Sequence, residues 1–230
     1  MLACFLRSRG HDMHVVVAAS QKGGAGKTTL AAHFAVAAEA AGHGPVILID
    51  TDPQGTLTKW WECREADTPA LAAVDASFLP AKIDQLRAQG FAMVVVDTPP
   101  AITASIQAVI GCADIVLMPV RPSPADLWAI GATVDLAINH GREFVFVISA
   151  ATRGASITTQ ACSALSQHGP VATVIHNRVA FAGAFASGQT VSEIDPKGQG
   201  AAEIIELLSF VLKLWTLTRP HESTHARKHV

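Results

Sequence analysis

The chain has 230 residues, of which 50% are hydrophobic and only 16% are charged, so disorder over most of its length is excluded and one α/β domain or two small ones are expected. The formal net charge of −2 argues neither for nor against a nucleic-acid partner. The four cysteines are widely spaced and form no Cys-x-x-Cys pair, which argues against a disulfide framework or a zinc site, so we expect buried free thiols. Because no window reaches about 18 uninterrupted apolar residues, we expect no membrane-spanning helix.

Apolar runs alternate with segments of helical character along the chain. We expect residues 1–12 to form a loose arm, residues 13–217 to form one domain, and residues 218–230 to form a disordered polar tail. The predicted strands are His14–Ala19, Val46–Ile49, Phe91–Val96, Asp114–Met118, Glu143–Ile148 and Val171–Ile175. The predicted helices lie at about 27–41, 79–89, 101–111, 124–139, 155–167 and 200–216.

The predicted strands are continuous runs of Val, Ile and Leu rather than alternating patterns, which indicates strands that are covered on both faces. Strands that alternate with helices form parallel sheets with right-handed crossovers. The sequence therefore predicts an α/β fold: a single, doubly wound, mostly parallel sheet with helices on both faces.

A glycine-rich segment, SQKGGAGKTT, connects the first predicted strand to the first predicted helix. Its glycines allow successive backbone N–H groups to point at a phosphate, and the following helix adds its positive N-terminal end. Lys27 would reach the β- and γ-phosphates of a nucleotide, the Thr28 hydroxyl would bind Mg²⁺, and Thr29 would donate to the α-phosphate. The residues expected at the nucleotide are Lys22, Gly23, Gly24, Ala25, Gly26, Lys27, Thr28 and Thr29.

The strict pattern G-x-x-x-x-G-K-[ST] is not met, because Gln21 stands where a glycine is expected and a second lysine, Lys22, follows it. This segment resembles the deviant Walker A family of P-loop ATPases, which includes ParA, MinD, the arsenite-pump ATPase and the nitrogenase iron protein. The resemblance extends from about residue 13 to residue 216. It implies ATP and Mg²⁺ as cofactors, slow hydrolysis, and a homodimer that forms on ATP binding. It also implies that Lys22 touches the nucleotide of the partner subunit, while Lys27 serves its own.

Carboxylates follow two of the predicted strands, where ligands of open parallel sheets bind. Asp50 and Asp52 are two residues apart and share a face of an extended segment. A carboxylate there can orient the attacking water or hold Mg²⁺ through water. The resemblance assigns Asp52 to the catalytic water and Asp50 to the Mg²⁺ network, although an Asp-Pro turn would also explain the pair.

Val94–Val96 followed by Asp97 has the form of a Walker B motif, in which Asp97 would bind Mg²⁺ through water. Thr98, Pro99 and Pro100 would begin the loop that senses the γ-phosphate, with Pro99 near the nucleotide. Together with the P-loop, these carboxylates predict ATP hydrolysis by in-line attack of water, with no covalent intermediate.

Several segments resemble the small plasmid-type ParA proteins, among them DTDPQGTLTKW, MPVRPSPADL and VIHNRV. This resemblance places His176 and Asn177 near the adenine. It implies a ParB-like adaptor protein, partition of plasmid or chromosomal DNA, non-specific binding of double-stranded DNA by the ATP dimer, and a cytoplasmic, nucleoid-associated location.

Non-specific DNA contacts are electrostatic, so exposed cations would carry them. Residues 140–230 hold 8 Lys and Arg against 6 Asp and Glu, a surplus of two positive charges, whereas residues 1–139 hold 9 against 13. The candidates for DNA contacts are Arg153, Arg178, Lys197, Lys213 and Arg219. The sequence departs from many relatives at Ala180, where they carry a basic residue. For each single candidate, an ordinary solvated or ion-paired cation is the favoured interpretation.

Three alternatives remain open. The apolar segment 204–217 would suit a membrane-recruited ATPase like MinD. A membrane-surface helix should have a richly basic polar face, whereas this segment has Glu203 and Glu206 beside its apolar residues. This favours a packed terminal helix and argues against a membrane partner. An electron-transfer ATPase like the nitrogenase iron protein would need cluster-bridging cysteines, and Cys112 lacks the expected setting. A ParA-like ATPase that positions a protein cargo is the third alternative.

Overall fold

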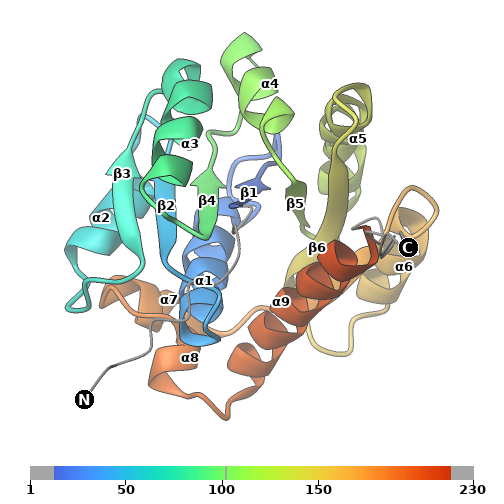
Figure 1. The fold of residues 1–230 in the computed structure, drawn as a ribbon. Coiled ribbons are helices and arrows are strands. Elements are labelled where there is room, and N and C mark those ends of the chain that lie inside the picture. The colour runs from blue at the N-terminus through green and yellow to red at the C-terminus, as the bar shows by residue number, and fades with distance from the viewer. Residues whose placement is uncertain (1–12, 102, 219–230) are drawn as a thin grey trace, which may run out of the picture.

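The computed structural model describes residues 13–101 and 103–218, which form one seven-stranded sheet with helices on both faces (Figure 1). The strand order is β3-β2-β4-β1-β5-β6-β7, and every neighbouring pair is parallel. The strands are β1 (His14–Ala18), β2 (Val46–Asp50), β3 (Ala70–Ala73), β4 (Met93–Asp97), β5 (Ile115–Val120), β6 (Glu143–Ala151) and β7 (Val171–His176). The doubly wound α/β prediction is confirmed.

The helices alternate with the strands along most of the chain. They are α1 (Lys27–Ala40), α2 (Thr56–Glu62), the 3₁₀ turn η1 (Ala76–Phe78), α3 (Leu79–Ala88), α4 (Ala104–Gly111), α5 (Pro124–Asn139), α6 (Ser156–Leu165), α7 (Val179–Ala186), α8 (Val191–Ile194) and α9 (Gln199–Thr218). The expected arm and most of the expected tail, including Arg219, lie outside the described residues.

Successive strand residues point to opposite faces of the sheet, and this alternation divides the core into two layers. In β1, Val16 and Ala18 face a layer closed by α1, α2, α7, α8 and α9. Val15 and Val17 face the other layer, which is closed by η1, α3, α4, α5 and α6. Because both faces are covered, the strands are apolar at consecutive positions, as the sequence indicates.

The structure adds elements that the sequence pattern does not predict, namely β3, α2, η1, α7 and α8. It also moves some boundaries, since the predicted strand Phe91–Val96 begins only at Met93 and β6 continues to Ala151. Cys63 is exposed and Cys112 and Cys162 are only partly buried, so the expectation of buried thiols is wrong for these residues, and Cys4 lies outside the described residues.

Helix α9 packs along β7 and α1, and it buries an apolar stripe that includes Ile204, Leu207 and Val211. Its acidic side chains turn toward the sheet, where Glu206 accepts a hydrogen bond of 2.6 Å from the Thr173 hydroxyl. The described part of the chain contains no helix that is both long enough and apolar enough to cross a bilayer.

A polar network joins α2 to the start of α8. The guanidinium of Arg64, whose side chain is only 4% exposed, forms two hydrogen bonds of 3.0 and 2.6 Å to the carboxylate of Glu193. Burial alone would raise the pKa of Glu193, but the hydrogen bonds from Arg64 and Thr190 hold it below its usual value. Trp60 also donates to the Gln189 carbonyl at 3.2 Å. These bonds fix α2, which follows the Asp52 loop, against the segment that carries α7 and α8.

Candidate nucleotide site

The glycine-rich loop leaves the end of β1, at the carboxyl edge of the sheet, and runs into α1. Gly24 and Gly26 have φ angles of 71° and 95°, a left-handed backbone that favours glycine. The Lys27 ammonium is buried in the loop and donates to the Lys22 carbonyl at 3.3 Å, whereas the Lys22 residue is exposed. The loop therefore holds the Lys27 side chain inside and leaves Lys22 exposed to solvent.

An irregularity in β6 supports the loop from the side. The pairing of β6 with β7 shifts between Ile148 and Ala151, and Ala150 has a φ of 50°, which is uncommon outside glycine. The Ser149 hydroxyl donates a hydrogen bond of 2.8 Å to the Ala25 carbonyl of the loop. Local backbone strain of this kind persists where the surroundings require it, commonly at functional sites. Sequence reasoning missed these residues, because no local pattern marks the bulge.

The strand register brings the predicted carboxylates together. Asp50 of β2 is paired in register with Asp97 of β4, and Asp97 is flanked on its other side by Ala18 of β1. The hydroxyl of Thr51 donates to the Asp97 carbonyl at 2.6 Å, and that of Thr98 donates to the Ala18 carbonyl at 2.9 Å. Both aspartates end their strands rather than follow them, and they lie beside the start of the P-loop.

Asp50 organises the segment that carries Asp52. One carboxylate oxygen of Asp50 accepts the Asp52 backbone N–H at 3.0 Å, and the other accepts the backbone N–H and the hydroxyl of Thr58 at 2.9 and 2.8 Å. Asp52 in turn accepts the Gln54 backbone N–H at 2.9 Å. In this structure Asp50 therefore fixes the loop and α2, and its place in the Mg²⁺ network stays a prediction.

Asp97 has the surroundings expected of a carboxylate that holds a cation. It is fully buried, and neither of its oxygens has a hydrogen-bond partner of good geometry among the described residues. Burial raises the pKa of Asp97 to about 7; the nearby Thr28 hydroxyl and Lys27 oppose this rise, and the Asp50 charge adds to it. Such a group fits a Mg²⁺ ion, which the Thr28 hydroxyl would bind directly and Asp97 would hold through water. When bound, the ion neutralises charge on the phosphates during hydrolysis.

We expect Asp97→Asn to stabilise the nucleotide-free protein at pH 8 while abolishing Mg²⁺-dependent hydrolysis. Between the ordinary pKa of 3.8 and about 7 the folded state binds the proton more tightly than the unfolded state, so the stability contributed by Asp97 falls as pH rises. The gain on substitution should be at most about 4 kcal/mol at pH 8 and should vanish below about pH 4.

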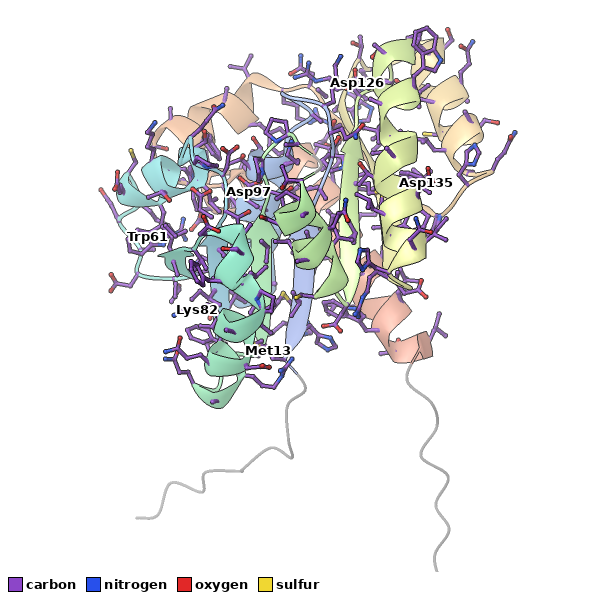
Figure 2. The ribbon with its side chains drawn as sticks, turned by 90° about the horizontal axis from the view of Figure 1, so that it is seen from above. Met13, Trp61, Lys82, Asp97, Asp126 and Asp135 are labelled. Atoms are coloured by element: carbon purple, nitrogen blue, oxygen red, sulfur yellow. The ribbon has the colours of Figure 1, made fainter. Side chains whose placement is uncertain are left out.

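Urea unfolding at pH 5 and pH 8 measures this difference, with Asp135→Asn as the control because Asp135 is exposed on α5 (Figure 2). A destabilisation of equal size at both pH values would show that the Asp97 carboxylate is not a strained buried charge.

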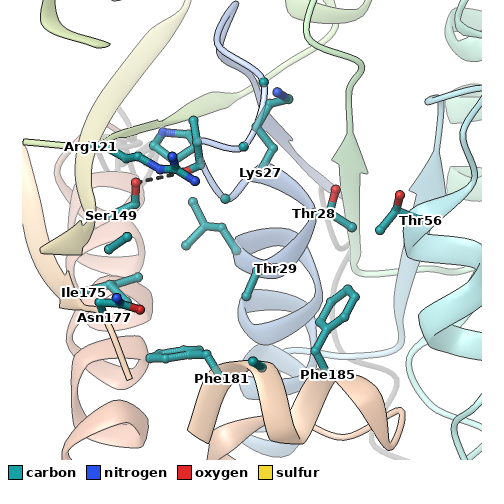
Figure 3. A pocket seen from close by; sticks show the side chains of 18 of the residues that line it. Lys27, Thr28, Thr29, Thr56, Arg121, Ser149, Ile175, Asn177, Phe181 and Phe185 are labelled. Carbon is teal, nitrogen blue, oxygen red and sulfur yellow. Dashed lines mark hydrogen bonds between the residues drawn. The ribbon is translucent and has the colours of Figure 1, made fainter. Parts of the chain in front are cut away.

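The loop and the strand ends border a cleft of about 730 Å³, a volume typical of small-molecule sites. One end contains the P-loop with Lys27, and α7 closes the other (Figure 3). Thr28, Thr29, Asp52, His176 and Asn177 line the cleft, as expected. Pro99 instead borders a small separate cavity, and Pro100 lines the cleft in its place.

Helix α7 supplies an apolar wall that the sequence analysis does not anticipate. Phe181 and Phe185 line the cleft, and Phe181 packs on the buried His33 ring with 5.0 Å between centroids. Burial lowers the pKa of His33 to about 4, with the hydrogen bond to the Thr29 carbonyl opposing it, so the ring is neutral near pH 7. The wall offers aromatic surface to a planar base at the end of the cleft away from the phosphates.

The candidate DNA contacts differ in their surroundings. The Arg178 guanidinium lies 2.6 Å from a Glu203 carboxylate oxygen that also contacts His176 at 2.7 Å, and Arg178 lines the cleft. Arg178 is therefore an ion-paired residue of the nucleotide site rather than a free surface cation. The other described candidates, Arg153, Lys197 and Lys213, are exposed.

Comparison with known proteins agrees with this geometry. The model of the CobQ/CobB/MinD/ParA nucleotide-binding domain matches residues 16–191. The chain is 32% identical over 206 residues to the maintenance of carboxysome distribution protein A of Halothiobacillus neapolitanus, covering 84% of this chain and 94% of that protein. It is 36% identical over 149 residues to protein ParA of Rhizobium radiobacter, covering 59% and 65%.

Among solved structures, an ATP complex of a variant McdA from Cyanothece superposes with a TM-score of 0.75 at 18% identity, covering 90% of this chain and 98% of that one. That likeness extends the shared fold over nearly all of the described residues. The P-loop, the buried Walker B carboxylate and the family match all indicate an ATPase that uses ATP and Mg²⁺. The chain belongs to the CobQ/CobB/MinD/ParA family of nucleotide-binding proteins.

Proposed function

We propose that this chain is an ATP-driven positioning switch that dimerises with ATP, binds double-stranded DNA without sequence preference, and distributes a protein cargo through an adaptor protein. The observation that supports it best is the 32% identity to a carboxysome distribution protein over 94% of that protein's length. This favours the protein-cargo alternative over partition of plasmid or chromosomal DNA.

The exposed Lys22 beside the buried Lys27 supports the dimeric switch. A lysine that serves its own nucleotide should lie inside the loop, as Lys27 does, whereas one that serves a partner must reach outward. On the resemblance to ParA proteins, ATP would join two subunits face to face across the cleft. Hydrolysis would then separate the two subunits, so that the rate of hydrolysis sets the lifetime of the dimer.

For DNA binding we propose Arg153, Lys197 and Lys213, which are exposed in the half of the chain with a positive surplus. Phosphate contacts release counterions, so each contact steepens the dependence of affinity on salt. We expect random-sequence duplex to bind with ATP but not with ADP, and affinity to fall at least about tenfold between 50 and 200 mM salt.

Fluorescence anisotropy of a labelled random duplex tests this proposal, with anionic vesicles assayed in parallel. The triple variant Arg153→Ala, Lys197→Ala, Lys213→Ala should lose DNA binding, and Arg87→Ala, which removes an exposed cation on α3, is the control. DNA binding that does not depend on the nucleotide would contradict the proposal, and ATP-dependent binding to vesicles alone would favour the MinD-like alternative.

Partition of plasmid DNA is the second candidate, because the chain also matches protein ParA at 36% identity. Deletion of the gene in its own host separates the two. Clustering of a protein assembly with normal plasmid retention supports the cargo proposal, and plasmid loss with a normally spaced assembly supports partition.

A further inference from the structure

Besides Lys27 and Arg178, a further cation lines the cleft. Arg121 comes directly after β5, the neighbour of β1 in the sheet, and it lines the cleft near Lys27 and the P-loop (Figure 3). Its Nη2 atom lies 3.1 Å from the position that a Cβ would occupy at Gly24. The guanidinium therefore rests against the loop backbone, in space that the missing side chain of Gly24 leaves open.

The other arginines near the site are neutralised, but Arg121 is not. Arg64 pairs with Glu193, and Arg178 pairs with Glu203. Within residues 13–101 and 103–218, no hydrogen bond or ion pair engages the Arg121 guanidinium. An unpaired guanidinium presents a planar fork of donors whose geometry matches a phosphate.

Gly24 lies between Lys22 and Lys27, on the curve of the loop where the β- and γ-phosphates bind in P-loop proteins. A cation above Gly24 faces that end of the phosphate chain rather than the base, because Phe181 and Phe185 lie at the opposite end of the cleft. ADP lacks the γ-phosphate, so a contact to it distinguishes the two nucleotides.

We propose that Arg121 binds the γ-phosphate of ATP within its own subunit and acts as a second phosphate-binding cation beside Lys27. During hydrolysis a bond forms between the water oxygen and the γ-phosphorus, and the bond from that phosphorus to the ADP oxygen breaks. One proton of the water stays on the inorganic phosphate, and the other is released to solvent. Arg121 donates hydrogen bonds to the γ-phosphate oxygens throughout, where negative charge is concentrated. This inference concerns ATP chemistry alone and does not depend on the cargo or on DNA.

The test compares Arg121→Ala, Arg121→Lys and the control Arg87→Ala, because Arg87 is also exposed but lies on α3 and does not line the cleft. Affinities for ATP and ADP are measured at protein concentrations at which the mass stays that of a monomer. We expect Arg121→Ala to weaken ATP binding about tenfold, to change ADP binding less than about twofold, and to slow single-turnover hydrolysis at saturating ATP by about tenfold or more.

Arg121→Lys should recover part of the ATP affinity, since it keeps the charge without the fork, and Arg87→Ala should match the wild type. The melting temperature without nucleotide should be unchanged in all three variants. Equal effects of Arg121→Ala on ATP and ADP would overturn the γ-phosphate assignment. An effect on ATP that appears only when the protein is dimeric would overturn the placement within the same subunit.

Discussion

Lys27→Ala should weaken ATP binding at least about a hundredfold, which corresponds to about 3 kcal/mol. Residue Lys27 is only 7% exposed, and its ammonium donates to the Lys22 carbonyl, close to Asp97 and Asp52. Burial lowers the pKa of Lys27, and those two carboxylates oppose the shift. Without Lys27, the phosphates would face both carboxylates with less compensating charge. Calorimetric titration with ATP measures the loss, and circular dichroism confirms that the variant is folded.

Lys22→Ala is the matched control, because it removes a lysine from the same loop that lies outside the site. We expect its ATP affinity to stay within about threefold of the wild type, since the exposed side chain supplies little to its own nucleotide. Its ATP-dependent dimer should be lost. An equal loss of affinity in the two variants would contradict the assignment of Lys22 to the partner's nucleotide.

Asp52→Ala should slow hydrolysis by about a hundredfold or more while ATP still binds, which is the range for removal of a group that positions or activates the attacking water. Asp52 lines the cleft and is held through its backbone N–H by Asp50. Removing a negative charge near the phosphates should leave ATP affinity equal or higher. The ATP-bound dimer should therefore persist.

Single-turnover release of phosphate, followed beside the wild type, measures the effect of this substitution. Asp52→Asn is the companion variant, because the amide oxygen can still accept the Gln54 N–H and preserve the turn. A normal rate in Asp52→Ala would remove Asp52 from catalysis, and a normal rate in Asp52→Asn alone would assign it a purely structural role.

The main architecture was predictable because its signals are local. Continuous apolar runs mark strands that are buried on both faces, and the residue pattern of the glycine-rich loop by itself indicates phosphate binding. The meeting of Asp50 and Asp97 also follows from sequence, since both close parallel strands and the carboxyl ends of such strands share one edge.

The elements that sequence missed lack such signals. Strand β3 has the sequence ALAA, and alanine favours helices over strands. Helix α7, VAFAGAFA, contains no charge and no clear periodicity, yet it is a half-exposed wall of the cleft. Helix α2 follows a left-handed Gly55 and is fixed mainly by Asp50 and Arg64, which are contacts made in three dimensions.

Three contacts at the site could not be predicted from the sequence, and the physical reason is the same for each. The Ser149 hydroxyl reaches the loop only because β6 bulges, Arg121 reaches Gly24 only because β5 neighbours β1, and Arg178 meets Glu203 only when α9 packs on β7. Each depends on segments distant in the chain. The last pairing makes Arg178 the weakest of the DNA candidates that were chosen on charge alone.

On the proposed function, ATP and not ADP joins two copies of this chain. Sedimentation velocity of the Asp52→Ala protein with Mg²⁺ and either nucleotide tests it most directly, since slow hydrolysis keeps the ATP state intact. We expect a species of twice the 24.1 kDa protomer mass with ATP and a monomer with ADP. The same mass with both nucleotides would contradict an ATP-dependent dimer.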